Sequence, residues 1–254
     1  MKVYFCFLFI IIILLIINSS QLYETFQDDN KTIELVIARY NEDLEWTTKE
    51  PFNKYKYTVY NKGENENFNK TNVNEIISVD NVGRCDHTYL YHIINNYNNL
   101  ADIVVFLPGS LDMSNKIDTA ERLINNITNL NKAVFLGTYS DDVKEEFYDF
   151  KLDEWQASYG LNADINNETT LLKSPTRPFG KWFQKNFGDI KVNYHCYFGI
   201  FSIDRRDIIQ NPIPYYQFLI KDLETHSNPE AGHYFERSWA AVFHPLTYTI
   251  IEPN

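Results

Sequence analysis

Three groups of polar residues in this sequence have the chemistry to bind a ligand or to move a proton. The first is the turn Asn81-Val82-Gly83-Arg84, which precedes a predicted amphipathic helix that carries His87. Free N–H groups at a helix N-terminus and a guanidinium together bind anions such as phosphate. We therefore predict an anion site at Asn81, Gly83, Arg84 and His87. The alternative is a structural turn with a surface arginine and a histidine that only packs.

The second group follows the first predicted strand, residues 32–38. Ligands in α/β folds bind at the carboxyl ends of strands, and this strand runs directly into charged and amide side chains. The candidate ligand contacts here are Arg39, Tyr40, Asn41 and Asp43. Glu42, in the same cluster, is a candidate catalytic base. The alternative is a solvated loop in which an Asn or Asp caps the backbone.

Two later strands end in the same way. Asn61 and Lys62 follow a strand predicted at residues 57–60, and Gly109 follows one predicted at residues 102–107. By the strand-end rule, we predict that these three residues also contact the ligand.

The third group is a carboxylate beside an imidazole on the last predicted helix. His233 and Glu236 are three residues apart and share one helical face, away from Trp239. In a cleft, such a pair is suited to general-base catalysis or to metal binding. We predict Glu236 as a catalytic base and His233 as a ligand contact. The alternative is an ion pair in which Glu236 anchors the helix to Arg39 or Arg205.

Composition and missing motifs narrow the class of protein. The formal net charge of −11 argues against nucleic acid as a partner. The sequence contains no P-loop, no G-x-G-x-x-G, no G-x-S-x-G, no H-E-x-x-H and no cysteine-rich zinc spacing. No metal site is predicted.

The order of predicted elements indicates one α/β domain over residues 32–254. Strands are predicted at residues 32–38, 57–60, 75–79, 102–107, 133–136 and 197–203. Helices are predicted at residues 84–97, 118–130, 178–187, 204–209 and 214–223, and after Asn228, which we expect to be the N-cap of the last helix. Residues 137–176 are irregular and acidic. The alternation of strands and helices predicts a mostly parallel central sheet flanked by helices.

The N-terminus has the character of a targeting segment. Lys2 precedes an unbroken apolar run at residues 3–17. This run lies between a signal-peptide core of about 7–15 residues and a full span of about 20. We predict a signal anchor or a signal peptide over residues 1–20 and a stem over residues 21–31. The chain is then a single-pass membrane protein whose C-terminal domain is lumenal or extracellular, with secretion as the alternative.

Such a compartment permits glycosylation and disulfide formation. The N-x-S/T sequons that are glycosylation candidates begin at Asn30, Asn69, Asn126 and Asn167. Cys85 and Cys196 either form a disulfide or remain free thiols.

Several segments together resemble DUF3431, a family of uncharacterised proteins. The resemblance covers about residues 33–245. It rests on ELVIARYNEDLEW at residues 34–46, VYNKG at 59–63, NVGRCDHTYLYHIINNYNNLAD at 81–102, VFLPG at 105–109 and GHYFERSWAAVF at 232–243. The chain departs from the family pattern at Cys85, where Glu is usual, and at Pro108, where Gln is usual.

The order of these segments is also similar, more loosely, to that of glycosyltransferases with the Rossmann-like GT-A fold. That fold has a first strand ending in a Tyr-Asn-Glu-like loop, an Asn-x-Gly-x turn before a helix, and an apolar strand ending at a metal-binding Asp-x-Asp. Here that last position reads Leu107-Pro108-Gly109-Ser110-Leu111-Asp112, so the motif is absent and only Asp112 is near.

This second resemblance implies transfer of a sugar from a nucleotide sugar to a hydroxyl acceptor. The nucleotide would lie over residues 39–42, Arg84 would hold the diphosphate, and Glu236 or Glu42 would deprotonate the acceptor. Without Asp-x-Asp, we expect metal-independent transfer in which arginines and Lys62 replace the cation's charge. A divalent cation bound with the nucleotide sugar is the alternative.

A non-catalytic glycan- or surface-binding protein on the same scaffold is the second functional hypothesis. Exposed Trp46, Trp155, Tyr159 and Trp182 would then stack on sugars. An enzyme is favoured if Arg39, Asn41, Glu42, Arg84 and Glu236 converge on one pocket. If Glu236 and the arginines instead form a closed, buried ion-pair network with no cavity beside it, these motifs are scaffold and binding elsewhere on the protein is favoured.

Overall fold

The side chains of the first strand show how the layers of this domain form. In the computed structural model, which describes residues 31–112, 114–153 and 171–253, β1 spans Ile33–Arg39. Leu35 and Ile37 belong to one hydrophobic core, whereas Val36 and Ala38 belong to a second. Successive strand side chains point to opposite faces. The continuous apolar run from Leu35 to Ala38 is therefore covered on both faces of the sheet.

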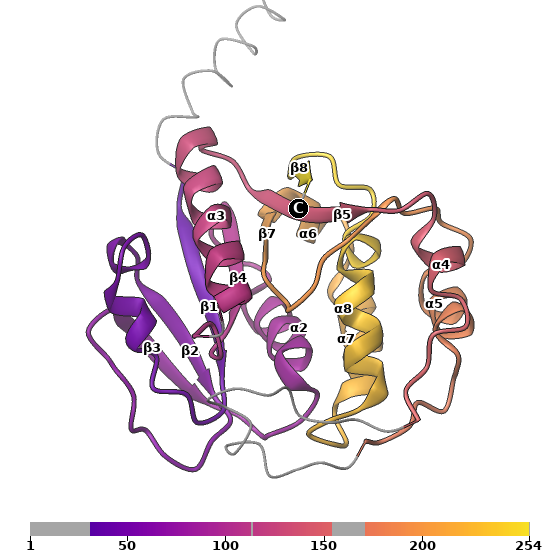
Figure 1. The fold of residues 1–254 in the computed structure, drawn as a ribbon, viewed down its shortest axis with the longest axis horizontal. Helices are drawn as coiled ribbons and strands as arrows, with labels where there is room; N and C mark the ends of the chain where they lie inside the picture. The colour runs from indigo at the N-terminus through magenta and orange to yellow at the C-terminus, as the bar shows by residue number, and fades with distance from the viewer. Residues whose placement is uncertain (1–30, 113, 154–170, 254) are drawn as a thin grey trace, which may run out of the picture. The chain divides into compact units, whose positions relative to one another are not determined.

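The central sheet has five strands in the order β3-β2-β1-β4-β7 (Figure 1). β2 (Tyr57–Asn61) and β4 (Ile103–Pro108) flank β1, and β3 (Val73–Ser78) pairs with β2; all of these pairings are parallel. β7 (Phe201–Asp204) runs antiparallel to β4. The predicted mostly parallel sheet with flanking helices is confirmed.

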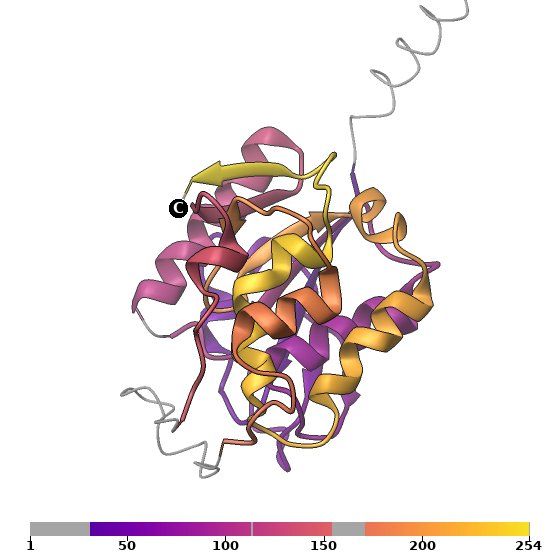
Figure 2. The same ribbon diagram turned by 90° about the vertical axis from the view of Figure 1, so that its right-hand side faces the viewer.

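Helices cover the two faces separately. α3 (Ser114–Leu130) packs its buried residues Ala120, Leu123, Ile124 and Ile127 into the core that contains Leu35 and Ile37. The opposite face carries α2 (Arg84–Asn96), α5 (Phe179–Phe187), α7 (Ile213–Leu219) and α8 (Glu230–Val242). α8 packs against both α2 and α5, as Figure 2 shows from the side.

A smaller sheet continues the domain beyond β7. β5 (Val134–Tyr139) lies between β6 (Tyr194–His195) and β8 (Ile250–Pro253). The Ser202 hydroxyl of β7 accepts a bond from the Val134 N–H (2.7 Å) and donates one to the Val134 carbonyl (2.8 Å). The Ser202 side chain therefore joins β7 of the central sheet to β5 of the smaller sheet, in place of hydrogen bonds between the two backbones.

Short helices fill the connections. They are η1 (Glu45–Thr48), η2 (Phe52–Lys54), α4 (Val143–Glu146), α6 (Arg205–Ile209) and η3 (Ile220–Leu223).

Two local predictions are wrong. The strand expected at residues 197–203 begins only at Phe201, because Phe198 (φ 68°) and Gly199 (φ 65°) adopt the left-handed conformation. Asn228 is not the N-cap of the last helix; Pro229 is, and the Asn228 side chain instead accepts a bond from Arg84.

The N-terminal predictions concern residues outside the described part of the chain. The targeting segment at 1–20, the stem up to residue 30, and the sequons at Asn30 and Asn167 all lie there. Among residues 31–112, 114–153 and 171–253, no helix has the length and apolar character needed to span a bilayer. Cys85 and Cys196 are both free thiols.

Candidate functional site

The sheet topology points to one edge as a ligand site. The chain proceeds outward from β1 to β2 and β3, and then returns to place β4 on the other side of β1. In open α/β sheets, ligands bind outside the carboxyl ends of the strands where the strand order reverses in this way. The residues that follow β1 and β4 are therefore the first candidates for a site.

The loop after β1 and the turn after β4 meet at this edge. Glu42 Oε2 accepts the Tyr40 N–H (2.7 Å), and a methyl carbon placed on Gly109 would lie 2.8 Å from the same oxygen. The Trp46 indole N–H donates to the Gly109 carbonyl (2.9 Å). Burial raises the pKa of Glu42 above its usual range, although the charges of Arg39 and Lys116 oppose this.

Lys116 of α3 completes this edge, and sequence reasoning missed it. Its Nζ donates to Ser110 Oγ (2.9 Å), and burial lowers its pKa. The charges of Glu42, Glu236 and Arg84 all act on this ammonium group. Lys116 therefore marks the point where the loop after β1, the first turn of α2 and the helix α8 come together.

The first turn of α2 is not an open anion site. Gly83 (φ 59°) donates its N–H to the His226 carbonyl (2.8 Å), and Arg84 (φ 54°) donates its N–H to the Ser227 carbonyl (3.2 Å). The Arg84 guanidinium also donates to Asn228 Oδ1 (3.2 Å). The segment before α8 thus occupies two N–H groups that were predicted to bind phosphate. Asn81 lies half-buried in the loop before this turn.

A buried carboxylate lies at the same turn. Asp86 accepts a bond from the Trp239 indole N–H (3.0 Å) and a weaker one from Cys85 Sγ (3.8 Å). Burial and the neighbouring charge of Glu236 raise the pKa of Asp86 to about 7. Asp86 lies in the first turn of α2, where the helix dipole favours a negative charge, but burial and Glu236 outweigh this effect and disfavour its charged form.

Lys62 does not have the role that we predicted. Its side chain is buried and donates to the carbonyls of Val82 and Arg84, so that it ties the end of β2 to the first turn of α2. Burial lowers the pKa of Lys62 to about 7. Lys116 is better placed to face a ligand's charge.

Glu236 is held by a backbone group and not by the predicted arginines. Its Oε1 accepts the Phe198 N–H (2.9 Å), and its Oε2 lies 3.9 Å from the Arg237 guanidinium. Arg205 instead pairs with Asp102 (3.2 Å). With 22% of its side chain exposed, Glu236 remains accessible.

Both predicted histidines are buried and neutral. His233 lies 3.4 Å from Asn228 Oδ1, and burial with the charges of Arg84 and Arg237 lowers its pKa to about 2. His87 stacks on Tyr91, and burial with the charge of Lys62 lowers its pKa to about 4. The packing alternative therefore describes His87 better than a phosphate contact.

Arg39 faces the protein and not the ligand edge. Its buried guanidinium donates to the Glu42 carbonyl (2.7 Å), to Asn61 Oδ1 (2.6 Å) and to Asn65 (2.8 Å to the carbonyl, 2.9 Å to Oδ1). Asn65 in turn donates to Asn41 Oδ1 (2.8 Å). Arg39, Asn41 and Asn61 thus fix the loops after β1 and β2, as in the buried-network alternative.

Asp43 also lies away from the centre. It is exposed, and its Oδ1 accepts the Glu45 N–H (2.9 Å) at the start of η1. This is the capping role that the solvated-loop alternative assigned to an Asn or Asp.

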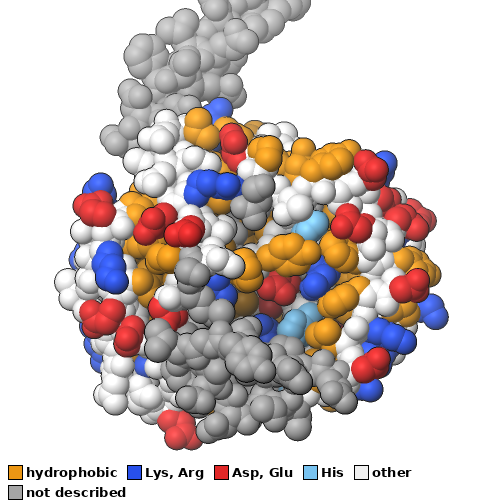
Figure 3. All heavy atoms as spheres, viewed as in Figure 1, with side chains coloured by type: hydrophobic (Ala, Val, Ile, Leu, Met, Phe, Trp, Pro, Cys, Tyr) orange, Lys and Arg blue, Asp and Glu red, His pale blue; other side chains and the backbone are white. Residues whose placement is uncertain are grey.

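The remaining polar groups surround a hollow. Figure 3 shows acidic, basic and histidine side chains in a depression between α3 and α8. Among the described residues, the charges of Glu42, Asp86, Glu236, Arg84 and Lys116 act on one another. In the described residues, no group of three or more His, Cys, Asp or Glu side chains is arranged to hold a metal ion.

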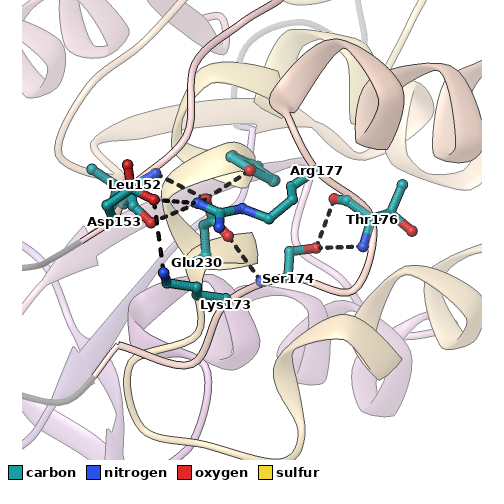
Figure 4. Close-up of polar contacts among 8 residues, drawn as sticks. Leu152, Asp153, Lys173, Ser174, Thr176, Arg177 and Glu230 are labelled. Atoms are coloured by element: carbon teal, nitrogen blue, oxygen red, sulfur yellow. Dashed lines mark hydrogen bonds and ion pairs between the residues drawn. The ribbon is translucent and has the colours of Figure 1, made fainter.

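A second buried polar cluster is structural. Glu230, at the start of α8, accepts bonds from the N–H groups of Leu152 and Ser174 (2.8 Å each), from Arg177 (3.1 Å) and from the Tyr234 hydroxyl (2.8 Å). Figure 4 shows how these contacts bring together two segments that are far apart in the sequence. All of these donors come from the chain itself, so this cluster anchors segments and offers no free carboxylate.

The fold is that of an α/β protein whose strand order reverses between β1 and β4. The model of the family described as protein of unknown function (DUF3431) matches residues 35–250, and the chain belongs to this family. The comparison with curated proteins finds no match.

Proposed function

We propose that this protein is a glycosyltransferase that transfers a sugar from a nucleotide sugar to a hydroxyl acceptor. The observation that carries this proposal is the meeting of Glu42, Lys116 and Glu236 at the strand-order reversal between β1 and β4. Carboxylates in unlike environments, one more buried than the other, are suited to distinct roles in a proton-transfer reaction.

The nucleotide is placed over the loop after β1, with its diphosphate toward Arg84 and Lys116. These two cations lie near enough for the charge of Arg84 to lower the pKa of Lys116, so both could face one diphosphate. Preorganised cations of this kind stabilise the negative charge that develops on the leaving diphosphate. No step requires a cation held by the protein.

Glu236 is the proposed base. Its accessible carboxylate takes the proton from the acceptor hydroxyl, whose oxygen attacks the anomeric carbon. The bond from that carbon to the phosphate oxygen breaks, and the nucleoside diphosphate leaves with the electron pair. Glu42, which is half-buried and lies close to Gly109, is the second candidate and is placed closer to the donor.

Isothermal titration of UDP-glucose, UDP-N-acetylglucosamine and GDP-mannose into the full chain, with and without Mn²⁺, tests the proposal. We expect binding of at least one donor, weakened in Lys116→Ala. Lys191→Ala, at an exposed lysine, is the matched control. Absence of binding to every donor counts against the transferase.

A non-catalytic glycan-binding protein is the alternative, and one observation favours it. The chain's own carbonyls occupy the Gly83 and Arg84 N–H groups, which leaves fewer donors for a diphosphate. Two members of the predicted aromatic platform are wrong, however. Trp46 and Trp182 are buried and donate to Gly109 and Asp222, and Trp155 and Tyr159 lie outside the described residues. Glycan binding without nucleotide binding would support this alternative.

We also propose anchoring through residues 3–17 with the domain lumenal or extracellular, or else secretion. The sequon residues Asn69, in a loop, and Asn126, on α3, are both half-buried. A mobility shift on endoglycosidase treatment of the expressed chain is expected, and a chain recovered without glycan from the secretory pathway would argue against this location.

A further inference from the structure

Phe198 adopts a backbone conformation that is unfavourable for a bulky residue. Its φ is 68°, and the next residue, Gly199, also has a positive φ of 65°. The left-handed conformation brings Cβ too close to the following carbonyl oxygen and is unusual for a large side chain. Burial in a core does not compensate this strain, because Phe198 is 38% exposed.

Contacts from two helices hold the strained turn in place. Phe198 donates its N–H to Glu236 Oε1 of α8 (2.9 Å), and the Gly199 carbonyl accepts the Tyr89 hydroxyl of α2 (2.8 Å). A methyl carbon at Gly199 would lie 2.9 Å from Cys85 Sγ, so the glycine is required by space as well. Strain that the surroundings impose in this way is concentrated at functional sites.

The Phe198 ring is positioned beside the groups of the proposed site. Lys116 Nζ lies 6.0 Å from the ring centroid, and Glu236 binds the Phe198 backbone directly. An exposed, fixed ring thus stands next to the proposed base and next to the cation at the ligand edge. The apolar C–H face of a pyranose complements the negative face of an aromatic ring.

We infer that the Phe198 ring is the platform on which a pyranose stacks, and that it determines which sugar Glu236 can reach. This inference rests on the proposed function, since it names the residue that binds the sugar at the same site. It also holds for a glycan-binding protein that uses this edge without catalysis.

Saturation-transfer NMR on the full chain tests the stacking. The probes are methyl β-glucoside, methyl β-galactoside and methyl α-mannoside. We expect saturation of the C–H protons on one face of at least one glycoside, retained in Phe198→Trp and lost in Phe198→Ala. Phe218→Ala, at another exposed phenylalanine, is the matched control and should leave the transfer unchanged.

A stability measurement tests the strain independently. Gly accepts a positive φ without steric cost, whereas Ala does not. Phe198→Gly should therefore melt about 2–4 °C above Phe198→Ala. Equal melting temperatures would show that the turn stores no strain and would remove the reason to assign it a function.

The outcomes separate this inference from the proposed function. Glycoside stacking that depends on Phe198, without binding of any nucleotide sugar, supports the platform and contradicts the transferase. Nucleotide-sugar binding together with equal glycoside transfer in wild type and Phe198→Ala supports the transferase and overturns the platform. No transfer to any glycoside in the wild type also overturns the platform.

Discussion

Glu42 and Gly109 lie so close together that a single methyl carbon on Gly109 would stand 2.8 Å from Glu42 Oε2. The two residues belong to loops that follow β1 and β4, on either side of the strand-order reversal. Their contact fixes where the Glu42 carboxylate points. The absence of a side chain at Gly109 therefore leaves room for the Glu42 carboxylate.

Gly109→Ala should displace the Glu42 carboxylate. A misplacement of about 1 Å in an active site costs on the order of 10²-fold in rate, and overpacking costs about 1–3 kcal/mol of unfolding free energy. Transfer assays and urea unfolding measure the two effects. Gly188→Ala is the control: its φ of 71° makes it strained, but nothing lies within 4 Å, so it should lose stability alone. Full activity in Gly109→Ala would contradict the role of Glu42.

Glu236→Gln should keep the fold and lose catalysis. The amide oxygen of Gln can still accept the Phe198 N–H, but it cannot take a proton from an acceptor. Loss of a general base lowers turnover by about 10²–10⁴-fold. Steady-state kinetics should show this decrease in kcat, while Glu75→Gln, at an exposed carboxylate on β3, behaves as wild type. A decrease of less than about tenfold would assign the base elsewhere.

Asp86→Asn should change how stability depends on pH. Burial and Glu236 raise the pKa of Asp86 from 3.8 to about 7, so the folded state binds this proton more tightly than the unfolded state. The stabilisation from this proton is complete below pH 3.8 and is lost as pH rises to about 7. In Asp86→Asn, the side-chain oxygen can still accept the Trp239 indole N–H, but the side chain does not ionise, so this stability is not lost as pH rises. Urea unfolding should therefore show that the difference in unfolding free energy between Asp86→Asn and the wild type grows between pH 4 and 7. A difference that stays constant over this range would contradict the raised pKa of Asp86.

Glu230→Ala should destabilise the fold without touching the ligand edge. The change leaves the N–H groups of Leu152 and Ser174 without their acceptor and removes the nearer of the two carboxylates that pair with Arg177, since only Asp153 remains. Loss of one partner of a buried pair costs about 3–5 kcal/mol. Guanidinium unfolding measures this, with Glu75→Ala expected to change stability by about 0.5 kcal/mol or less. A loss below about 1 kcal/mol would show that the cluster contributes little.

Periodicity predicted the layers well, because burial of β1 and α3 follows directly from the spacing of their apolar residues. It failed at Phe198, where an apolar run suggested a continuous strand. The left-handed break there depends on bonds from Glu236 and Tyr89, which come from distant parts of the sequence. No local pattern carries that information.

The site residues also divide into those that local sequence patterns predict and those that depend on contacts with distant parts of the chain. Glu42 and Glu236 follow from strand ends and helical faces, and the charges of both act on Lys116. The side chains of Arg39 and Lys62 point inward and bind backbone carbonyls. Residue type alone could not show this, because an arginine or a lysine at these positions could equally point outward to a ligand. Lys116 follows a strand end by only a few residues, and the strand-end rule applied past Gly109 would have found it.

Hydrogen exchange on the full chain, with and without the nucleotide sugar that binds most tightly, tests the central claim most directly. The claim is that this ligand binds at the reversal between β1 and β4. We predict slower amide exchange in peptides that cover residues 40–46 and 109–116, with no change at the edge strand β3. Protection confined to other segments, or no protection at saturating ligand, would contradict this location of the site.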